Sequence, residues 1–461
     1  MKSYVINREK KAPPGWGAQE EKNMDEGRRK YGAVAFLPLV VFLIIYVGCG
    51  ITFTMMGVEN PFGMFPRHVA ILVGIGVAFL LAPKINMSEK LDVFCANMGN
   101  SGVMMTILIY LMAGGFQGAA AAMGGKDSVI NLSLNFLPVS VLIPGVFLMC
   151  CLISTAIGTS MGTIAAMAPV AIGVAQGAGL NLAAVSAAVI GGAYFGDNLS
   201  MISDTTISAA QGCGSQMRDK FSMNFRIALP AAAVALVLYA VVGGGGQGAI
   251  QAGAFDILQV LPYVVVLITA VMGVNVALVL FAGILLTGVI GLTQGTVGFF
   301  GWVQAIGDGM SDMFSISIVA AMISGIIGLV RYYGGAEWLV GAITSKINSR
   351  KEAEYGIGLM SGLLSAAMVN NTIGIIVTCP MAKEIGEKYK IAPKRLASLV
   401  DIFACAFLAI MPHDGGMLIV TELADVSPLS VMKYSFYIFG LLISTCATIQ
   451  FGLMRTKEEK K

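Results

Sequence analysis

Long hydrophobic runs alternate with short polar segments along most of this 461-residue chain. A helix that spans a bilayer needs about 20 mostly apolar residues, and runs of that order recur from residue 31 onward. We predict spanning helices over 31–56, 67–83, 103–125, 183–211, 226–243, 256–272, 275–292, 314–330, 396–412 and 431–453. The pattern predicts an all-α polytopic membrane protein, with the lipid bilayer as its surroundings.

The composition agrees with this prediction and excludes several functions. Hydrophobic residues make up 56% of the chain and charged residues 12%, whereas soluble domains carry about 25% charged residues. A net charge of +3, spread over the ends of the spans, does not favour a nucleic-acid partner. The eight cysteines are scattered without a CxxC motif, which favours buried small side chains over a disulfide framework or a metal site.

The basic residues predict which side of the membrane each polar segment faces. They gather in the N-terminal tail, in the C-terminal tail and in the segments 84–101, 212–226, 331–355 and 383–395. The positive-inside rule places these segments and both termini in the cytoplasm. Residues 1–30 lack the apolar region of a signal peptide. We therefore expect a multi-pass protein of the cell (inner) membrane.

The chain also matches itself at a shift of 211 residues, since GVFLMCCLISTA at 145–156 aligns with GIGLMSGLLSAA at 356–367. The loop QGAGLNL after the first copy has no basic residue, while 383–395 has five, so the copies should face opposite ways. We predict a cytoplasmic tail at 1–30, a first inverted repeat at 31–243, an exterior linker at 244–255, a second repeat at 256–454 and a cytoplasmic tail at 455–461.

Two further apolar segments, 137–178 and 355–382, predict re-entrant hairpins. The second has 28 residues between two cytoplasmic loops, too few for two crossings of about 20 residues each. We place the hairpin tips at 157–163 and 368–374, where hydroxyl and amide side chains could satisfy freed backbone groups. Both tips are expected to point to one central site.

The stretch GGAYFGDNLSMISDTTISAAQ, residues 191–211, carries polar side chains inside an apolar run. An aspartate at mid-bilayer costs roughly 2.5–3.5 kcal/mol on insertion scales, so Asp197 and Asp204 need compensation. They are seven residues apart and would share a face of a continuous helix. Gly196 and the short polar residues after it predict a break in the helix at about 183–211, and the second repeat has a counterpart at about 396–414.

These residues supply candidate ligands. We predict a sodium and proton site formed by Asp197, Asp204, Asn198, Ser200, Ser203, Thr159 and Ser160. We predict a substrate-facing set formed by Thr163, Asn370, Asn371, Thr372, Asp401, His413 and Asp414. Simpler readings stay open, because lone hydroxyls often bond back to their own helix, Asp401 could serve helix packing, and His413 and Asp414 could be solvated at the outer end of a span.

GTSMGT at 158–163 and GAYFGDNLSMISDTT at 192–206 resemble the signature regions of the NhaC-type sodium/proton antiporter family, whose pattern reads approximately FGD..SP.SDTT. Asn371-Thr372 resembles the Asn-Thr hairpin tips of the wider ion transporter superfamily, which includes sodium-coupled dicarboxylate carriers. The resemblance covers most of the chain from about residue 31. Met201 stands where the family often has proline, and Asn198 where a lysine is common. The resemblance thus implies the transporter class more firmly than the transported species.

We therefore expect a secondary active transporter, with sodium/proton antiport by alternating access as the leading hypothesis. A buried carboxylate that holds either a proton or a sodium ion would couple the two fluxes by competition. The alternative is sodium-coupled transport of a small carboxylate or amino acid. An intramembrane aspartyl protease is disfavoured because Tyr194 replaces the first glycine of GxGD. We expect no enzyme activity and no cofactor, and a homodimer is one option for the oligomeric state.

Overall fold

The computed structural model describes residues 31–56, 58, 64–136, 138–201, 203–243, 254–272 and 274–455. Every regular element in these ranges is a helix. The predicted N-terminal tail 1–30, nearly all of the predicted linker 244–255 and residues 456–461 of the predicted C-terminal tail lie outside the described residues. The described chain divides into two compact units, one formed by residues up to 96 with 325–342 and one by 97–324 with 343–461.

The first unit contains a short helical hairpin against the end of a later helix. Its helices are η1 (Gly32–Phe36), α2 (Leu37–Met55), α3 (Arg67–Leu80), most of α4 (Met87–Met98), the end of α15 (Phe314–Tyr332) and most of α16 (Gly335–Thr344). The Lys90 ammonium donates to the Phe79 and Leu81 carbonyls, each at 2.7 Å, and so satisfies the end of α3. The Tyr333 hydroxyl donates to the Ala78 carbonyl at 2.9 Å.

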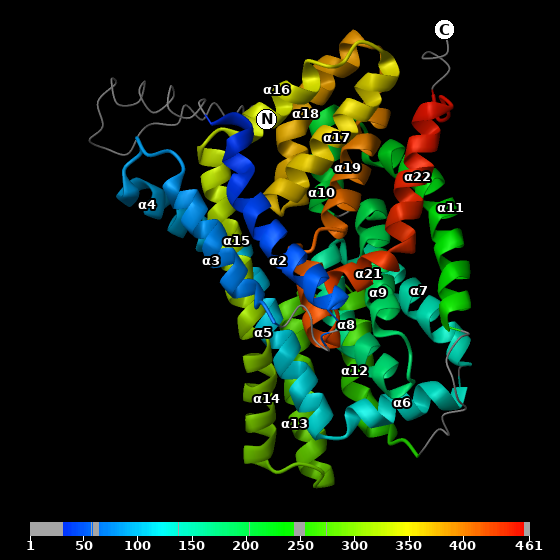
Figure 1. Ribbon diagram of the computed structural model, residues 1–461. Coiled ribbons are helices and arrows are strands. Elements are labelled where there is room, and N and C mark those ends of the chain that lie inside the picture. Colours follow the sequence, from blue (N-terminus) through cyan, green and yellow to red (C-terminus); the bar gives the residue numbers. More distant parts are fainter. Residues whose placement is uncertain are drawn as a thin grey trace, which may run out of the picture. The chain divides into compact units, whose positions relative to one another are not determined.

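The second unit holds the remaining helices. They are α5 (Ser101–Ala122), α6 (Gly125–Phe136), α7 (Val139–Ile157), α8 (Ser160–Gly177), α9 (Leu182–Leu199), α10 (Asp204–Cys213), α11 (Met217–Gly243), α12 (Ile257–Val271), α13 (Val276–Gln294), α14 (Phe299–Asp312), the start of α15, α17 (Arg350–Met368), α18 (Asn371–Lys388), α19 (Pro393–Ala409), α20 (Gly415–Ala424), α21 (Pro428–Lys433) and α22 (Phe436–Gln450). In Figure 1, α11 and α22 lie side by side, and these two helices pack together.

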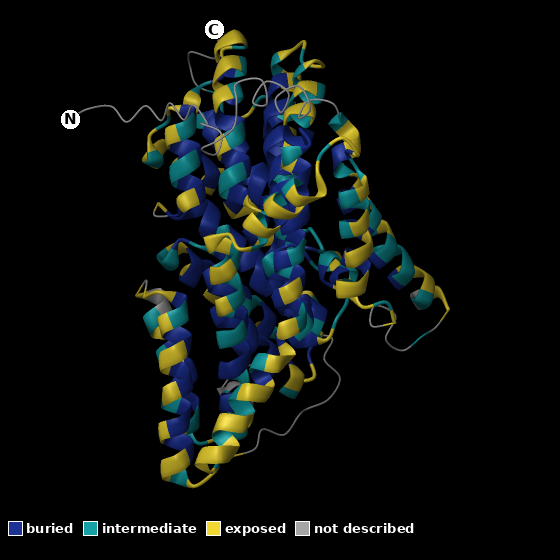
Figure 2. Cartoon of the chain, turned by 90° about the vertical axis from the view of Figure 1, so that its left-hand side faces the viewer, coloured by how far each residue is buried: buried dark blue, intermediate teal, exposed yellow. Residues whose placement is uncertain are grey.

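Helices α8 and α9 form the interior of this unit. Buried residues make up 83% and 89% of their apolar windows, more than in the other candidate spans. Figure 2 shows buried residues on the inner faces of the helices and exposed ones on the outer faces. Small residues allow α9 to approach α7 closely, because a Cβ at Gly192 would lie 2.5 Å from the Phe147 carbonyl oxygen. The site described below therefore lies on the most enclosed helices.

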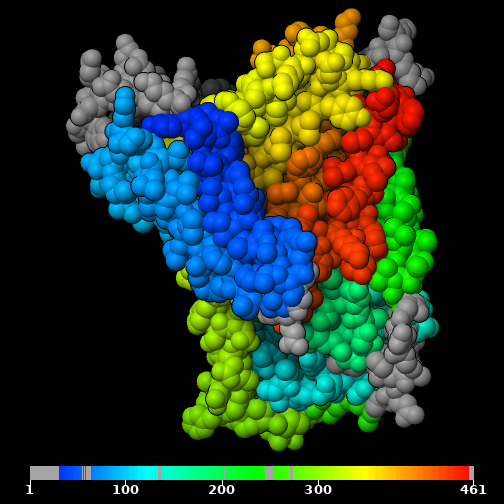
Figure 3. Space-filling model, viewed as in Figure 1, coloured from blue at the N-terminus to red at the C-terminus, as the bar shows by residue number. Residues whose placement is uncertain are grey.

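Two sets of three helices have matching bounds. Helices α7, α8 and α9 begin at residues 139, 160 and 182, and α17, α18 and α19 begin 211 residues later, at 350, 371 and 393. The set α7–α8–α9 packs together, as does α17–α18–α19. Beyond each set the packing crosses over, since α10 packs on α18 and α19, and α20 packs on α8 and α9. Figure 3 shows α22 (red) beside the second set (yellow to orange).

Both predicted hairpins are pairs of packed helices joined by two residues, Gly158 and Thr159 in the first and Val369 and Asn370 in the second. The second hairpin is longer than the apolar segment 355–382 from which we predicted it, and re-entrance stays a prediction. The arms α17 and α18 have 19 and 18 residues, because the helices continue through polar residues on both sides of the apolar segment 355–382. Each arm would measure about 27 Å or more at 1.5 Å per residue.

Other boundaries also differ from the prediction. Eight helices are long and apolar enough to cross a membrane, among the described residues. The chain from 212 to 226, predicted as a loop, is helical from Met217 onward. Helix α14 was missed because its polar face interrupts the apolar run, and the predicted span 431–453 is two helices, α21 and α22, separated at Tyr434.

Candidate ion site at the break between α9 and α10

The helix predicted over 183–211 is interrupted between Leu199 and Asp204. Helix α9 begins with the Asn181 side chain accepting from the Ala184 amide at 3.1 Å, and it ends where Ser200 adopts an extended backbone. Helix α10 starts after Ser203, which is also extended. We had expected the break at Gly196, but this residue does not form it. It lies inside α9, where a Cβ would meet Ser154 Cβ at 2.4 Å.

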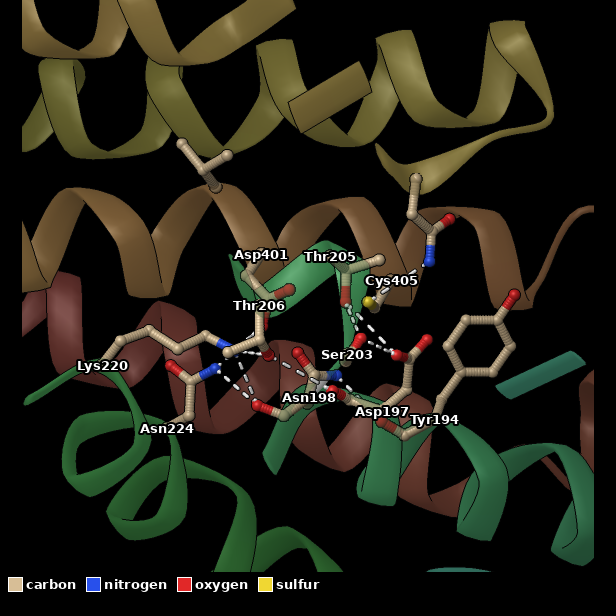
Figure 4. A network of polar contacts seen from close by, with 12 residues as sticks. Tyr194, Asp197, Asn198, Ser203, Thr205, Thr206, Lys220, Asn224, Asp401 and Cys405 are labelled. Atoms are coloured by element: carbon tan, nitrogen blue, oxygen red, sulfur yellow. Dashed lines mark hydrogen bonds and ion pairs between the residues drawn. The ribbon is translucent and has the colours of Figure 1, made fainter. Parts of the chain in front are cut away.

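The Asp197 carboxylate lies at this break and is 2% exposed. It accepts hydrogen bonds from Ser203 Oγ at 2.5 Å, Ser160 Oγ at 2.8 Å and Thr205 Oγ1 at 3.3 Å. Ser160 begins α8, so the tip of the first hairpin contributes directly to this cluster. Figure 4 shows Ser203 and Thr205 converging on Asp197 from the start of α10. In the described part of the chain, no ammonium or guanidinium group forms an ion pair with Asp197.

Asp204 does not share this cluster, because the break turns its side chain away. It is exposed and accepts a hydrogen bond from Thr372 Oγ1 at 2.7 Å. Thr372 belongs to the tip of the second hairpin. The two aspartates that a continuous helix would have placed on one face are thus separated, one contacting each hairpin tip.

A second buried network of hydrogen bonds surrounds Asp401. Its central residue is Lys220, which the sequence analysis did not name. Lys220 is fully buried, and its ammonium lies 2.6 Å from Asp401 Oδ2, 2.8 Å from the Asn198 carbonyl oxygen and 2.6 Å from Thr206 Oγ1. Asn224, one turn further along α11, donates to the same carboxylate at 3.0 Å and the same carbonyl at 3.2 Å. Figure 4 shows Asn198 between Lys220 and Asp197.

The helical period of α11 could have indicated that Lys220 and Asn224 are buried. The buried face of α11 repeats every three to four residues and includes Lys220, Met223, Asn224, Ile227, Ala228 and Ala231. Counting Lys220 among cytoplasmic loop charges hid it, because a count of basic residues ignores the helical period. The ammonium of Lys220 reaches the main chain of Asn198 from α11, at 2.8 Å from the carbonyl oxygen.

Thr163, Asn370 and Asn371 form hydrogen bonds with groups other than the Asp197 carboxylate. Thr163 Oγ1 bonds back to the Thr159 carbonyl at 3.0 Å, as lone hydroxyls in helices often do. Asn370 is exposed and caps α18 by accepting from the Ile373 amide. Asn371 is 7% exposed, and its amide donates to Cys405 Sγ at 3.4 Å. Ser200 is buried at the end of α9.

His413 and Asp414 are buried rather than solvated at an outer end. His413 Nε2 lies 3.0 Å from the Ala366 carbonyl oxygen, in the second hairpin. Asp414 caps α20 by accepting from the Gly416 amide at 3.0 Å and the Met417 amide at 3.3 Å. Both side chains therefore have structural partners that the sequence alone did not indicate.

The model of the Na+/H+ antiporter family matches residues 31–244 and 248–455, which is nearly the whole described chain. The chain belongs to the Na+/H+ antiporter family. The predicted family and the predicted transporter class are confirmed, and this is a family of antiporters rather than enzymes.

The names of individual relatives in the Na+/H+ antiporter family indicate different transported species. The Na+/H+ antiporter NhaC of Bacillus subtilis is 27% identical over 76% of this chain and 84% of that protein. The malate-2H+/Na+-lactate antiporter of the same organism is 27% identical over 44% of this chain, and the match spans only 42% of that protein. The arginine/ornithine antiporter ArcD of Halobacterium salinarum is 24% identical over 75% of this chain and 77% of that protein.

Proposed function

We propose that this chain exchanges sodium ions for protons and that Asp197 is the carboxylate for which the two compete. One observation carries the proposal: Asp197 is a buried carboxylate whose hydrogen-bond partners among the described residues are all hydroxyl groups. A buried charge needs a counter-charge, and a proton or a sodium ion can supply it. Family membership supports the choice of these two ions.

The hydroxyl groups suit both states of such a site. A serine or threonine hydroxyl carries one proton and two lone pairs, so Ser160, Ser203 and Thr205 can donate to the carboxylate or turn their lone pairs toward a cation. Oxygen ligands of this kind replace the hydration shell of a hard cation. Thr159, Ser200 and the Asn198 side chain remain predicted ligands, whereas the Asn198 carbonyl already accepts from Lys220 and Asn224.

We further propose alternating access by two inverted repeats whose hairpin tips meet at the α9–α10 break in mid-membrane. The 211-residue offset of helix bounds and the crossed packing of α10 and α20 support two equivalent halves. Ser160 of one tip contacts Asp197, and Thr372 of the other contacts Asp204. Movement of either hairpin would therefore change the contacts at the break. The basic residues support a cell-membrane location with cytoplasmic termini.

A second candidate is sodium-coupled transport of a small carboxylate or amino acid. It is favoured by the second hairpin tip, where Asn370, Thr372 and Asp204 retain some exposure while Asn371 has a buried amide oxygen without a hydrogen-bond partner. Such groups could bind an organic molecule beside a sodium site. The names of the malate/lactate and arginine/ornithine relatives agree with an organic substrate.

The test uses purified protein in proteoliposomes that enclose a pH-sensitive dye and carry an imposed pH gradient. Sodium is added outside, first alone and then with a panel of amino acids and small organic acids. We expect sodium alone to collapse the gradient, Asp197→Asn to abolish the response, and Asp219→Asn, which changes an exposed aspartate of α11, to preserve it. A wild-type protein that responds only when an organic compound is present would establish the second candidate instead.

A further inference from the structure

Lys220 joins four helices at the end of the proposed ion site, and neither the family comparison nor the exchange chemistry assigns it a role. Its ammonium has three protons and three acceptors within 2.8 Å: Asp401 of α19, the Asn198 carbonyl of α9 and Thr206 of α10. The side chain is completely buried. Every proton of this ammonium therefore has a partner, and each partner comes from a different helix.

The contact with Asn198 matters because α9 ends one residue later. The last carbonyls of a helix have no partner within the helix, and they carry partial negative charge that a cation satisfies. Lys220 fills this position at Asn198, directly beside the carboxylate residue Asp197. Thr206, which accepts from Lys220, itself donates to the Asp197 carbonyl oxygen at 3.4 Å. The ammonium thus contacts the main chain at the end of α9 and a side chain at the start of α10, and so links the two sides of the break.

The same contacts restrict where a transported ion can bind. Asp401 Oδ2 and the Asn198 carbonyl are both taken by the ammonium and by Asn224 Nδ2. A tethered cation at this position repels a second cation. Although Asp401 Oδ1 has no hydrogen-bond partner among the described residues, this repulsion favours an ion on the Asp197 side of the break, among the hydroxyls of Ser160, Ser203 and Thr205.

We propose that Lys220 is a positioning residue of the sodium site, whose ammonium holds the end of α9 against the start of α10 and so orients Asp197 and Ser203 toward the ion. This inference rests on the proposed function, because it assigns a role in the same site. The competing explanation is that Lys220 only neutralises the buried charge of Asp401. If Lys220 positions the site, a change in the geometry of its side chain should weaken sodium binding even when its charge is kept. If Lys220 only neutralises Asp401, such a change should leave sodium binding as it is.

Two variants separate geometry from charge. Lys220→Arg keeps the positive charge but replaces the compact ammonium by a planar, longer guanidinium. Lys220→Met with Asp401→Asn removes both charges together, so no unpaired buried charge remains, while the contacts to Asn198 and Thr206 are lost. Lys351→Met, which changes an exposed lysine at the start of α17, is the matched control.

Each variant is purified, its melting temperature in detergent is measured with and without sodium, and its sodium-driven proton flux is measured in proteoliposomes. Loss of a residue that orients a metal ligand typically weakens the metal site about 10-fold to 100-fold. We expect the sodium concentration for half-maximal flux to rise by about that factor in both Lys220 variants. The sodium-dependent gain in melting temperature should shrink in parallel, while Lys351→Met behaves as the wild type.

The positioning role is overturned if Lys220→Arg, or the charge-neutral double variant, folds with a wild-type sodium dependence. It is also overturned if only the maximal rate falls. If the double variant does not fold, Lys220→Arg alone decides between the two explanations. Failure of the proposed function gives a different result, because the wild-type protein itself would then show no response to sodium.

Discussion

At the residue scale, the decisive feature is the contrast between two buried carboxylates. Asp401 has a cationic partner at 2.6 Å, whereas the carboxylate oxygens of Asp197 accept only from hydroxyls in the part of the chain that the structure describes. A carboxylate paired with lysine is already compensated, so exchange of small cations is expected at Asp197. The sequence analysis placed Asp197 in the sodium and proton site and Asp401 in the substrate-facing set. It could not predict the cationic partner of Asp401, because Lys220 lies 181 residues away from Asp401 in the chain.

Ser203 should be important for sodium affinity. It gives the shortest hydrogen bond to Asp197, at 2.5 Å, and hydrogen bonds to charged groups contribute about 1.5–3 kcal/mol. Ser203→Ala is expected to raise the sodium concentration for half-maximal flux by about tenfold or more, since 1.4 kcal/mol is a factor of ten in an equilibrium. The control is Ser311→Ala, whose exposed hydroxyl bonds only within α14. Equal sodium affinity in both variants would remove Ser203 from the site.

At the element scale, the two hairpins are built alike but turn with different residues. Gly158 joins α7 to α8 at φ +79°, and Val369 joins α17 to α18 at φ +46°. The left-handed region suits glycine but strains a β-branched side chain. The second hairpin thus stores backbone strain beside Asn370 and Thr372, while the first does not.

Exchanging these residues should change stability in opposite directions. Left-handed backbone costs an L-residue roughly 1–2 kcal/mol, so Gly158→Val should destabilise the protein by about that amount. Val369→Gly relieves this strain, but the greater conformational freedom of glycine in the unfolded chain costs about 0.5–1 kcal/mol of stability. The free energy of unfolding should therefore rise by up to about 1.5 kcal/mol. Melting temperatures of both variants in detergent test this. A lower melting temperature for Val369→Gly would mean that the valine side chain contributes more than its backbone strain costs.

At the scale of the whole molecule, the helix bounds repeat after 211 residues, although only scattered residues are identical. Equivalent positions should therefore lie on opposite sides of the membrane if the repeats are inverted. Gln176 and Glu387 are such a pair, both exposed near the ends of α8 and α18. The loop QGAGLNL that begins at Gln176 has no basic residue, whereas 383–395 has five, so we predict that Gln176 faces outside and Glu387 the cytoplasm.

Labelling of single cysteines in whole cells tests this arrangement. Gln176→Cys and Glu387→Cys are introduced after the exposed Cys95 has been changed to serine. A membrane-impermeant maleimide is expected to label residue 176 in intact cells and residue 387 only after the cells are permeabilised. Labelling of both from the same side would exclude inverted repeats. The Cys95→Ser protein alone gives the background.

Much of this architecture follows from the sequence by itself, because apolar length and helical period are local properties. The helical class, many of the long apolar helices, the two short turns at 158–159 and 369–370, the interruption near Asp197 and the family could be predicted from the residues. Only the tertiary structure decided which polar residues meet. It separated Asp204 from Asp197, joined Lys220 to Asp401 and Asn198, and brought Ser160 to Asp197. Those contacts depend on how helices distant in sequence pack, and the spacing of residues along one helix carries no information about its neighbours.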